Sequence, residues 1–171
     1  MRKLTLDDFE VLARIRAKEE VSRYLGTLAM QTPEKIAARL QFYISCYETH
    51  GFGVSAVLRK SDGEFIGWGG LQPLEDSGEI EVGYGFDTPH WGRGYATEMA
   101  EAWLRYGFEE AGLERIVAVA VPENTASRRV MEKLGMKFEK YAEHYQNQCV
   151  RYAIRREEFR PSNSFYAVHH E

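Results

Sequence analysis

A glycine-rich loop over residues 90–98 contains the residue types of an anion-binding site. It reads His-Trp-Gly-Arg-Gly-Tyr-Ala-Thr-Glu and joins a strand-like run at 79–86 to a strongly amphipathic segment. Gly92 and Gly94 can adopt backbone angles that turn N–H groups inward. A helix that starts behind them would direct its free N–H groups and its positive dipole end toward the same place. The loop therefore predicts binding of a phosphate group.

Two well-known glycine-rich loops fit this stretch poorly. A Walker A loop ends in Gly-Lys followed by Ser or Thr, and the chain contains no such combination. A dinucleotide-binding fingerprint requires a third Gly or Ala where this chain has Thr97, and it belongs to an early βαβ unit. The phosphate is therefore expected to belong to another kind of ligand.

The loop resembles the acyl-CoA loop of the GCN5-related N-acetyltransferases (GNAT), Gln/Arg-x-x-Gly-x-Gly/Ala, at residues 91–96. Before it, 79–91 is similar to the strand and turn of the ribosomal-protein alanine N-acetyltransferase branch, which commonly has Trp where other branches have Gln. After it, 124–136 resembles the second signature of the family. The three segments follow in the family's order, and the similarity extends from Leu4 to about Phe159.

The resemblance implies an α/β fold, with a mixed, mostly antiparallel central sheet and flanking helices. No linker or internal repeat divides the chain of 171 residues, so we expect one GNAT domain over residues 1–160. The C-terminal tail, 161–171, lies outside the resemblance, and we expect it to be mobile. The alternative is that this tail packs on a second subunit through Phe165, Tyr166 and Val168.

Apolar spacing and capping residues predict the elements that position the loop. Helices are expected at 9–18, 32–47, 96–110 and 126–134, with a short turn at 21–25; strands are expected at 53–59, 65–72, 79–86, 116–121, 136–140 and 149–155. The run 116–121 is continuously apolar and follows a crossover helix, so it should be a central strand parallel to 79–86. The helix at 96–110 is expected to bury Met99, Ala102, Trp103 and Tyr106.

In the family, pantetheine inserts between two parallel strands that splay apart. The resemblance assigns a main-chain role to Phe86, whose N–H would polarise the thioester carbonyl and stabilise the oxyanion of the tetrahedral intermediate; the alternative is a core side chain. The pyrophosphate is assigned to the loop residues Gly92, Arg93, Gly94, Tyr95, Ala96 and Thr97. Asn124 is assigned to the pantetheine arm, with an ordinary helix-entry role as the alternative.

Transfer to an amine requires an unprotonated nitrogen, so a base must remove a proton. Strand alternation places Glu79, Glu81, Gly83 and Gly85 on one face of 79–86, where the glycines leave room for a substrate. Burial there would raise the pKa of Glu81 toward neutrality. Glu81 is therefore the first candidate for the base and Glu79 the second; the alternative for Glu81 is a solvated or salt-bridged strand residue.

The acid that protonates the departing thiolate is less clearly marked. Many family members use a Tyr on the last helix, but the matching position, seven after Asn124, is Met131. Ser127 resembles the Ser proposed for this role in the ribosomal-protein branch, with a bond to the helix N-terminal backbone as the alternative. The thiolate can also leave unassisted, since a free thiol has a pKa of roughly 8.5.

The resemblance implies direct transfer of an acetyl group from acetyl-CoA, as cosubstrate, to a primary amine. The acceptor would be a protein N-terminus or a small-molecule amine, and the enzyme a monomer or homodimer. The N-terminal helices would flank the acceptor cleft, where candidate lining residues are Tyr43, Tyr47, Trp68 and Tyr145, although core positions are commoner for aromatics. Two other classes stay open, a non-catalytic acyl-CoA-binding module and a nucleotide-binding α/β protein.

Composition excludes several partners. The chain has 22 Lys and Arg against 26 Asp and Glu, a net charge of −4, which argues against nucleic acid or an anionic membrane. It contains neither an apolar signal region nor a run of membrane-spanning length, so a cytoplasmic protein is expected. Cys46 and Cys149 and the five His residues form no metal-ligand spacing, so reduced thiols and no metal are expected.

Overall fold

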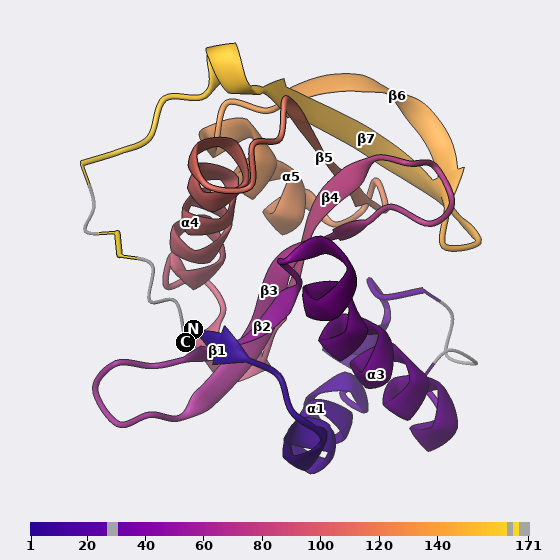
Figure 1. The fold of residues 1–171 in the computed structure, drawn as a ribbon. Coiled ribbons are helices and arrows are strands. Elements are labelled where there is room, and N and C mark those ends of the chain that lie inside the picture. The colour runs from indigo at the N-terminus through magenta and orange to yellow at the C-terminus, as the bar shows by residue number, and fades with distance from the viewer. Residues whose placement is uncertain (27–30, 164–165, 168–171) are drawn as a thin grey trace.

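The structure is a computed structural model that describes residues 1–26, 31–163 and 166–167. A seven-stranded sheet in the order β1-β2-β3-β4-β5-β7-β6 forms its centre (Figure 1). Neighbouring strands are antiparallel except β4 and β5, which are parallel. The strands are β1 (Arg2–Lys3), β2 (Val54–Leu58), β3 (Phe65–Pro73), β4 (Ile80–Phe86), β5 (Arg115–Ala120), β6 (Lys137–His144) and β7 (Asn147–Arg155).

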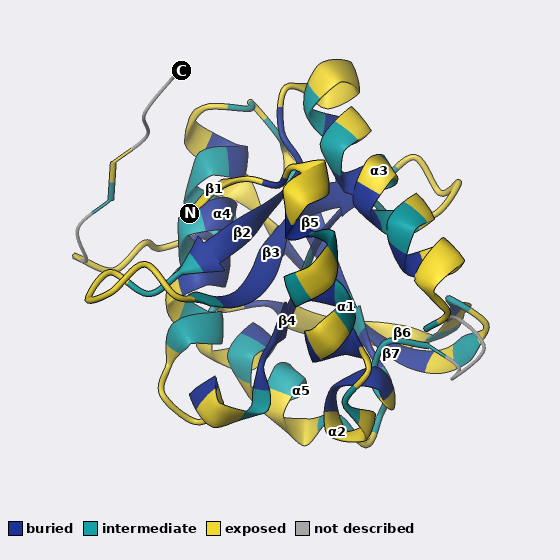
Figure 2. Cartoon of the chain, turned by 90° about the horizontal axis from the view of Figure 1, so that it is seen from below, coloured by how far each residue is buried: buried dark blue, intermediate teal, exposed yellow. Residues whose placement is uncertain are grey.

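Helices cover both faces of the sheet, and each face has its own apolar core. On one face, α4 (Tyr95–Glu109) and α5 (Thr125–Lys133) pack on the strands. On the other face lie α1 (Phe9–Arg16), α2 (Glu19–Ser22) and α3 (Pro33–His50). Figure 2 shows the buried central strands between these layers. The mixed α/β sheet with flanking helices is thus confirmed, as is the parallel arrangement of β4 and β5.

The buried face of α4 differs from the expected one. Its buried residues are Met99, Ala100, Trp103, Leu104, Gly107 and Phe108. Ala102 and Tyr106, expected on this face, are only partly buried. Successive side chains of a helix point about 100° apart around its axis. A shift of the buried face by one residue therefore changes which side chains it contains. Tyr106 instead packs its ring edge on Trp103, with centroids 5.3 Å apart.

The last two strands form a hairpin that the sequence indicates only in part. β6 and β7 extend beyond the expected 136–140 and 149–155 and meet at Tyr145 and Gln146. These two residues have φ values of 52° and 61°. Two-residue turns with positive φ favour Asn and Gly, neither of which occupies the turn, so the sequence carries no signal for it.

The described part of the C-terminal segment runs beside α4. The Ser162 N–H donates to Glu101 Oε1 at 2.5 Å, and the Tyr166 ring lies 4.7 Å from the Arg105 guanidinium. Phe165 and Val168, which the sequence offered for subunit packing, lie outside the described residues. Within the described ranges, no helix is both long enough and apolar enough to span a membrane.

Candidate active site

A cavity of about 510 Å³ extends along the gap where β4 and β5 diverge. Their register pairs Glu81 with Val117, and no pair follows toward Phe86 within these two fully described strands. The Asp87 N–H donates to the Ile66 carbonyl of β3 at 2.9 Å. Because successive N–H groups of a strand point in opposite directions, the Phe86 N–H points away from β3 and into the gap. The expected splay of the two strands is therefore present.

Trp91 fixes the chain between β4 and the glycine loop. Its indole Nε1 donates to the Phe86 carbonyl oxygen at 2.8 Å, and the residue is 42% exposed. Asp87, which precedes the single-turn helix η3 (Thr88–His90), accepts a hydrogen bond from Lys18 Nζ at 2.5 Å. Trp91 thus occupies the Phe86 carbonyl, while the Phe86 N–H, which belongs to the preceding peptide group, faces the cavity.

The glycine loop leads into the N-terminus of α4, where Gly92 and Gly94 have φ values of 73° and 88°. A Cβ added to either would meet no atom within 4 Å, so backbone conformation, not packing within this chain, requires glycine. Gly94 is the N-cap of α4 and offers no side-chain acceptor. The N–H groups of residues 95–97 consequently have no partner within the described chain. Of the predicted loop residues, Arg93 alone does not line the cavity.

Glu81 lies in the cavity wall and is 3% exposed. Its Oε1 accepts hydrogen bonds from Gln72 Nε2, at 2.6 Å, and from the Tyr145 hydroxyl. Burial raises the pKa of Glu81 above the ordinary carboxyl value, while the two donated hydrogen bonds oppose that rise without cancelling it. A carboxylate with a raised pKa is a stronger base than an exposed one. The structure therefore contradicts the solvated alternative for Glu81.

Tyr145 reaches Glu81 from the β6–β7 turn, which Glu75 holds in place. The Tyr145 N–H donates to Glu75 Oε1 at 2.9 Å, and His144 Nδ1 lies 2.9 Å from Glu75 Oε2. Burial and the neighbouring Glu81 charge raise the pKa of Tyr145, so its hydroxyl stays protonated and donates. Tyr43, Trp68 and Tyr145 line the cavity as the sequence suggested, whereas Tyr47 does not.

Glu79, the second candidate for the base, lies in an ion-pair network outside the cavity wall. Both of its oxygens are 2.6 Å from Arg151 Nη2, and Oε1 is 3.5 Å from Arg115 Nε. Both arginines also bind Glu139. The two arginines therefore neutralise the Glu79 charge, and Glu79 does not line the cavity.

The open space expected over the two glycines of β4 is only partly present. A Cβ at Gly83 would lie 3.6 Å from Gln72 Nε2, an ordinary contact. A Cβ at Gly85 would lie 2.4 Å from the Trp68 ring, which already fills that space. Trp68 pairs with Gly85 across β3 and β4. The expectation of room over Gly85 was wrong because alternation within one strand does not show what its neighbour projects there.

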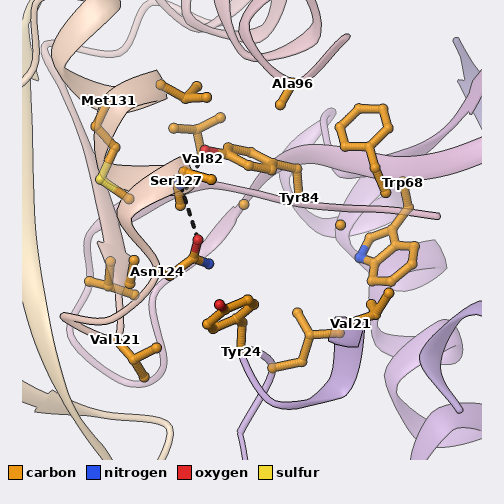
Figure 3. Close-up of a pocket in the computed structure, with 18 of the residues that line it drawn as sticks. Val21, Tyr24, Trp68, Val82, Tyr84, Ala96, Val121, Asn124, Ser127 and Met131 are labelled. Carbon is orange, nitrogen blue, oxygen red and sulfur yellow. Dashed lines mark hydrogen bonds between the residues drawn. The ribbon is translucent and has the colours of Figure 1, made fainter. Parts of the chain in front are cut away.

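Asn124, Ser127 and Tyr84 meet on the opposite side of the cavity (Figure 3). Asn124 Oδ1 accepts from the Ser127 N–H at 3.1 Å and caps α5, which is the helix-entry role. The Ser127 and Tyr84 hydroxyls are 2.9 Å apart. Burial raises the pKa of Tyr84 to about 12. A protonated phenol thus contacts Ser127, which lies one helical turn before Met131. The sequence did not single out Tyr84, because its partner is 43 residues away.

Residues 1–137 match the family model of the acetyltransferase (GNAT) domain. That match covers well over half of the chain, which therefore belongs to the GNAT acetyltransferase family. The protein is an acetyltransferase. The family expected from the loop, the preceding strand and the second signature is confirmed.

Relatives and solved structures agree with this assignment. The chain is 45% identical over 94 residues to the uncharacterized protein YkkB of Bacillus subtilis, covering 53% of this chain and 55% of that protein. It is 30% identical over 149 residues to the uncharacterized N-acetyltransferase YoaA of Bacillus subtilis, covering 86% and 84%. An acetyltransferase (GNAT family) structure from Bacillus anthracis has a TM-score of 0.75 and 30% identity, covering 92% and 94%. The match thus spans about half of YkkB and about half of this chain.

A member of the expected branch also shares the fold. The ribosomal-protein-S5-alanine acetyltransferase from Vibrio fischeri has a TM-score of 0.74 and 19% identity, with 94% of each chain covered. The fold expected for residues 4–159 is thus found in solved structures of the family.

Proposed function

We propose that this acetyltransferase moves the acetyl group of acetyl-CoA directly to a primary amine in the cavity between β4 and β5. The observation that carries the proposal is Glu81, a buried carboxylate whose pKa is raised by burial, in the wall of that cavity. The Phe86 N–H faces the same cavity. A base and an oxyanion-stabilising donor are the two groups that acyl transfer to an amine requires.

The residues of this chain fit a CoA thioester. Open space beside Gly92 and Gly94 lets phosphate approach the backbone, and the N–H groups of 95–97 can bind it. The diverging edges of β4 and β5 offer unpaired main-chain groups to an amide-containing arm. The side-chain amide of Asn124 also lines this path. Acetyl-CoA, when bound, supplies an acetyl group activated as a thioester.

Glu81 takes the proton that the acceptor amine must lose, directly or through water. Two further polar atoms of the cavity wall, Gln72 Oε1 and His144 Nε2, are buried without a hydrogen-bond partner among the described residues. Buried polar atoms are rarely left unsatisfied. We assign them to the N–H groups of the acceptor, which would position its nitrogen beside Glu81.

The N–H of Phe86 donates to the carbonyl oxygen on which negative charge develops. Ser127 holds a proton for the leaving sulfur, and Tyr84 supports it through the 2.9 Å contact between their hydroxyls. Because burial raises the pKa of Tyr84 to about 12, this phenol keeps its proton at neutral pH. The pair thus supplies the hydroxyl that Met131 cannot.

Tyr84→Phe should lower kcat about tenfold, which is less than the about 10²- to 10⁴-fold that general acid–base catalysis typically contributes, because a thiolate leaves partly without help. Ser127→Ala should have a similar effect, and the double variant should be no worse than either single one if the hydroxyls act as one unit. Steady-state thiol release measures all three. Tyr141→Phe on the exposed face of β6 is the control, and full activity in Tyr84→Phe would contradict the assignment.

Thermal unfolding with saturating acetyl-CoA, CoA, ATP or NADH tests the cofactor. A ligand at 100 times its Kd adds about 2.7 kcal/mol of stability, which is a shift of several degrees for a domain of this size. Acetyl-CoA and CoA alone should raise Tm. A shift with ATP or NADH instead, or none with CoA, would overturn the proposed role of the loop; release of CoA with an amine panel then tests transfer.

A further inference from the structure

Two arginines line the half of the cavity that lies under the N-terminal helices. Arg16 comes from α1 and Arg39 from α3. Arg16 is 6% exposed; its Nε donates to Gln31 Oε1 at 3.0 Å, and its guanidinium lies 5.5 Å from the Trp68 ring centroid. The Arg39 guanidinium lies 5.8 Å from the centroid of the Tyr145 ring. Both charges are therefore held by neutral groups.

Neither arginine has a carboxylate within ion-pair distance in residues 1–26, 31–163 and 166–167. Arg151 is a useful contrast, because it is 8% exposed and binds two glutamates. Glu81 forms no ion pair with either arginine and takes its hydrogen bonds from neutral donors, although the Arg39 charge acts on it and lowers its pKa. Burial, and then the charge of Arg39, lower the pKa of Arg16. A buried cation without a counter-ion is costly.

The rest of this end of the cavity is apolar and aromatic. Val21, Tyr24 and Trp68 face the same open space, across from Asn124 and Ser127 (Figure 3). Such walls suit the hydrocarbon part of a small organic molecule. The two guanidinium groups suit an oxyanion, which an arginine can bind through two N–H groups.

We propose that the acceptor is an amine that also carries a carboxylate, as an amino acid or a derivative does, and that this carboxylate binds Arg16 and Arg39. The inference rests on the proposed transfer to an amine, whose nitrogen would lie beside Glu81. A plain alkylamine leaves both guanidinium groups without an ion-pair partner, and a polyamine adds charge of the same sign. The cavity therefore selects for an anionic group on the acceptor.

Matched acceptors test this selection. For an apolar, a polar and an acidic side chain, the amino acid is compared with its primary amide and with the amine that lacks the carboxyl group. We expect kcat/KM to be at least about tenfold higher for the carboxylate form, because hydrogen bonds to charged groups are among the stronger ones. Equal use of the three forms would overturn the inference. Preference for O-phosphoethanolamine over every carboxylate would overturn the choice of carboxylate.

Arg39→Gln should remove most of this preference, whereas Lys35→Gln should leave it unchanged. Lys35 lies one turn earlier on α3, is exposed and does not line the cavity, so its substitution removes the same charge elsewhere. Arg16→Met should also reduce the preference. It should leave Tm of the ligand-free protein unchanged or higher, because a buried unpaired charge is replaced by an apolar side chain. A preference that survives in both arginine variants would refute the assignment.

Binding of product analogues separates this inference from the proposed transfer. In the presence of CoA, N-acetylphenylalanine should raise Tm more than N-acetylphenylalaninamide, and Arg39→Gln should abolish the difference. Equal shifts would count against the arginine site even if no amine is turned over. Conversely, amines without a carboxylate could be acetylated rapidly, at a rate that Arg39→Gln does not lower. That result would support the proposed acetyl transfer but contradict the carboxylate site at the arginines.

Discussion

Glu81→Gln should lower kcat by about 10²- to 10⁴-fold while acetyl-CoA binding changes little, because only the base is lost. The Gln side chain is similar in shape, and its carbonyl can still accept from Gln72 and Tyr145, so the cavity wall should keep its geometry. Initial rates of CoA release give kcat, and isothermal titration gives the Kd for acetyl-CoA. Equal losses in kcat and in acetyl-CoA affinity would point to a collapsed cavity and not to a missing base.

The pH profile gives a second test of the same carboxylate. Burial raises the pKa of Glu81, and a base works only when it is deprotonated, so wild-type activity should rise with pH through that raised pKa. Glu81→Gln should lack this limb. If the variant keeps the full rate from about pH 6 to about pH 9, another group removes the proton.

The same substitution should increase stability at neutral and alkaline pH. Because the folded-state pKa of Glu81 is raised, folding favours its protonated form. That contribution is fully present below about pH 4.3, the ordinary Glu pKa, and is lost as pH rises through the folded-state pKa. Gln cannot ionise, so the Tm difference between variant and wild type should be positive at high pH and shrink on acidification.

Glu79→Gln is the matched control, because Glu79 lies two residues before Glu81 and was the second candidate for the base. It removes the charge of one of the two carboxylates that bind the buried Arg151 side chain, which is 10% exposed, and should therefore destabilise the fold. Because Glu79 does not line the cavity, activity of the folded protein should remain. A loss of rate with a gain in stability for Glu81→Gln, and an unchanged rate with a loss of stability for Glu79→Gln, would distinguish a base from a structural carboxylate.

Local sequence patterns predicted the parts of the site that are built from neighbouring residues. The loop at Gly92 and Gly94 requires positive φ, and the helix behind it begins where its amphipathic spacing begins. Strand alternation likewise placed Glu81 on the cavity side. Each of these features is determined by a few consecutive residues, so it can be predicted from a single sequence.

Contacts between distant segments could not be predicted in this way. The Tyr145 hydroxyl binds Glu81 across 64 residues, from a turn without Asn or Gly. Trp68 fills the space over Gly85 through the register of β3 and β4. Arg39 reaches the cavity only because α3 packs over the sheet. Each depends on tertiary placement, which periodicity within a single element does not specify.

Gly94→Val should weaken acetyl-CoA binding by at least about 100-fold, which corresponds to losing two or more hydrogen bonds to a charged phosphate group. Gly94 has φ of 88°, where a β-branched residue is strongly disfavoured, so the loop must change its path or hold strain of about 1–2 kcal/mol. Either result displaces the N–H groups at the start of α4. No atom lies within 4 Å of the added Cβ, so the core is undisturbed and the protein should fold.

Gly112→Val separates lost binding from lost stability. Gly112 has φ of 71° just beyond the other end of α4, and an added Cβ would come no closer than 3.9 Å to Arg156 Nη2. Its substitution therefore imposes a similar backbone strain far from the cavity. Circular dichroism and Tm should show comparable destabilisation of both variants, while titration with acetyl-CoA should show binding only in Gly112→Val. Binding lost equally in both would mean that strain anywhere on α4 is sufficient, whereas binding kept in Gly94→Val would remove the glycine loop from the cofactor site.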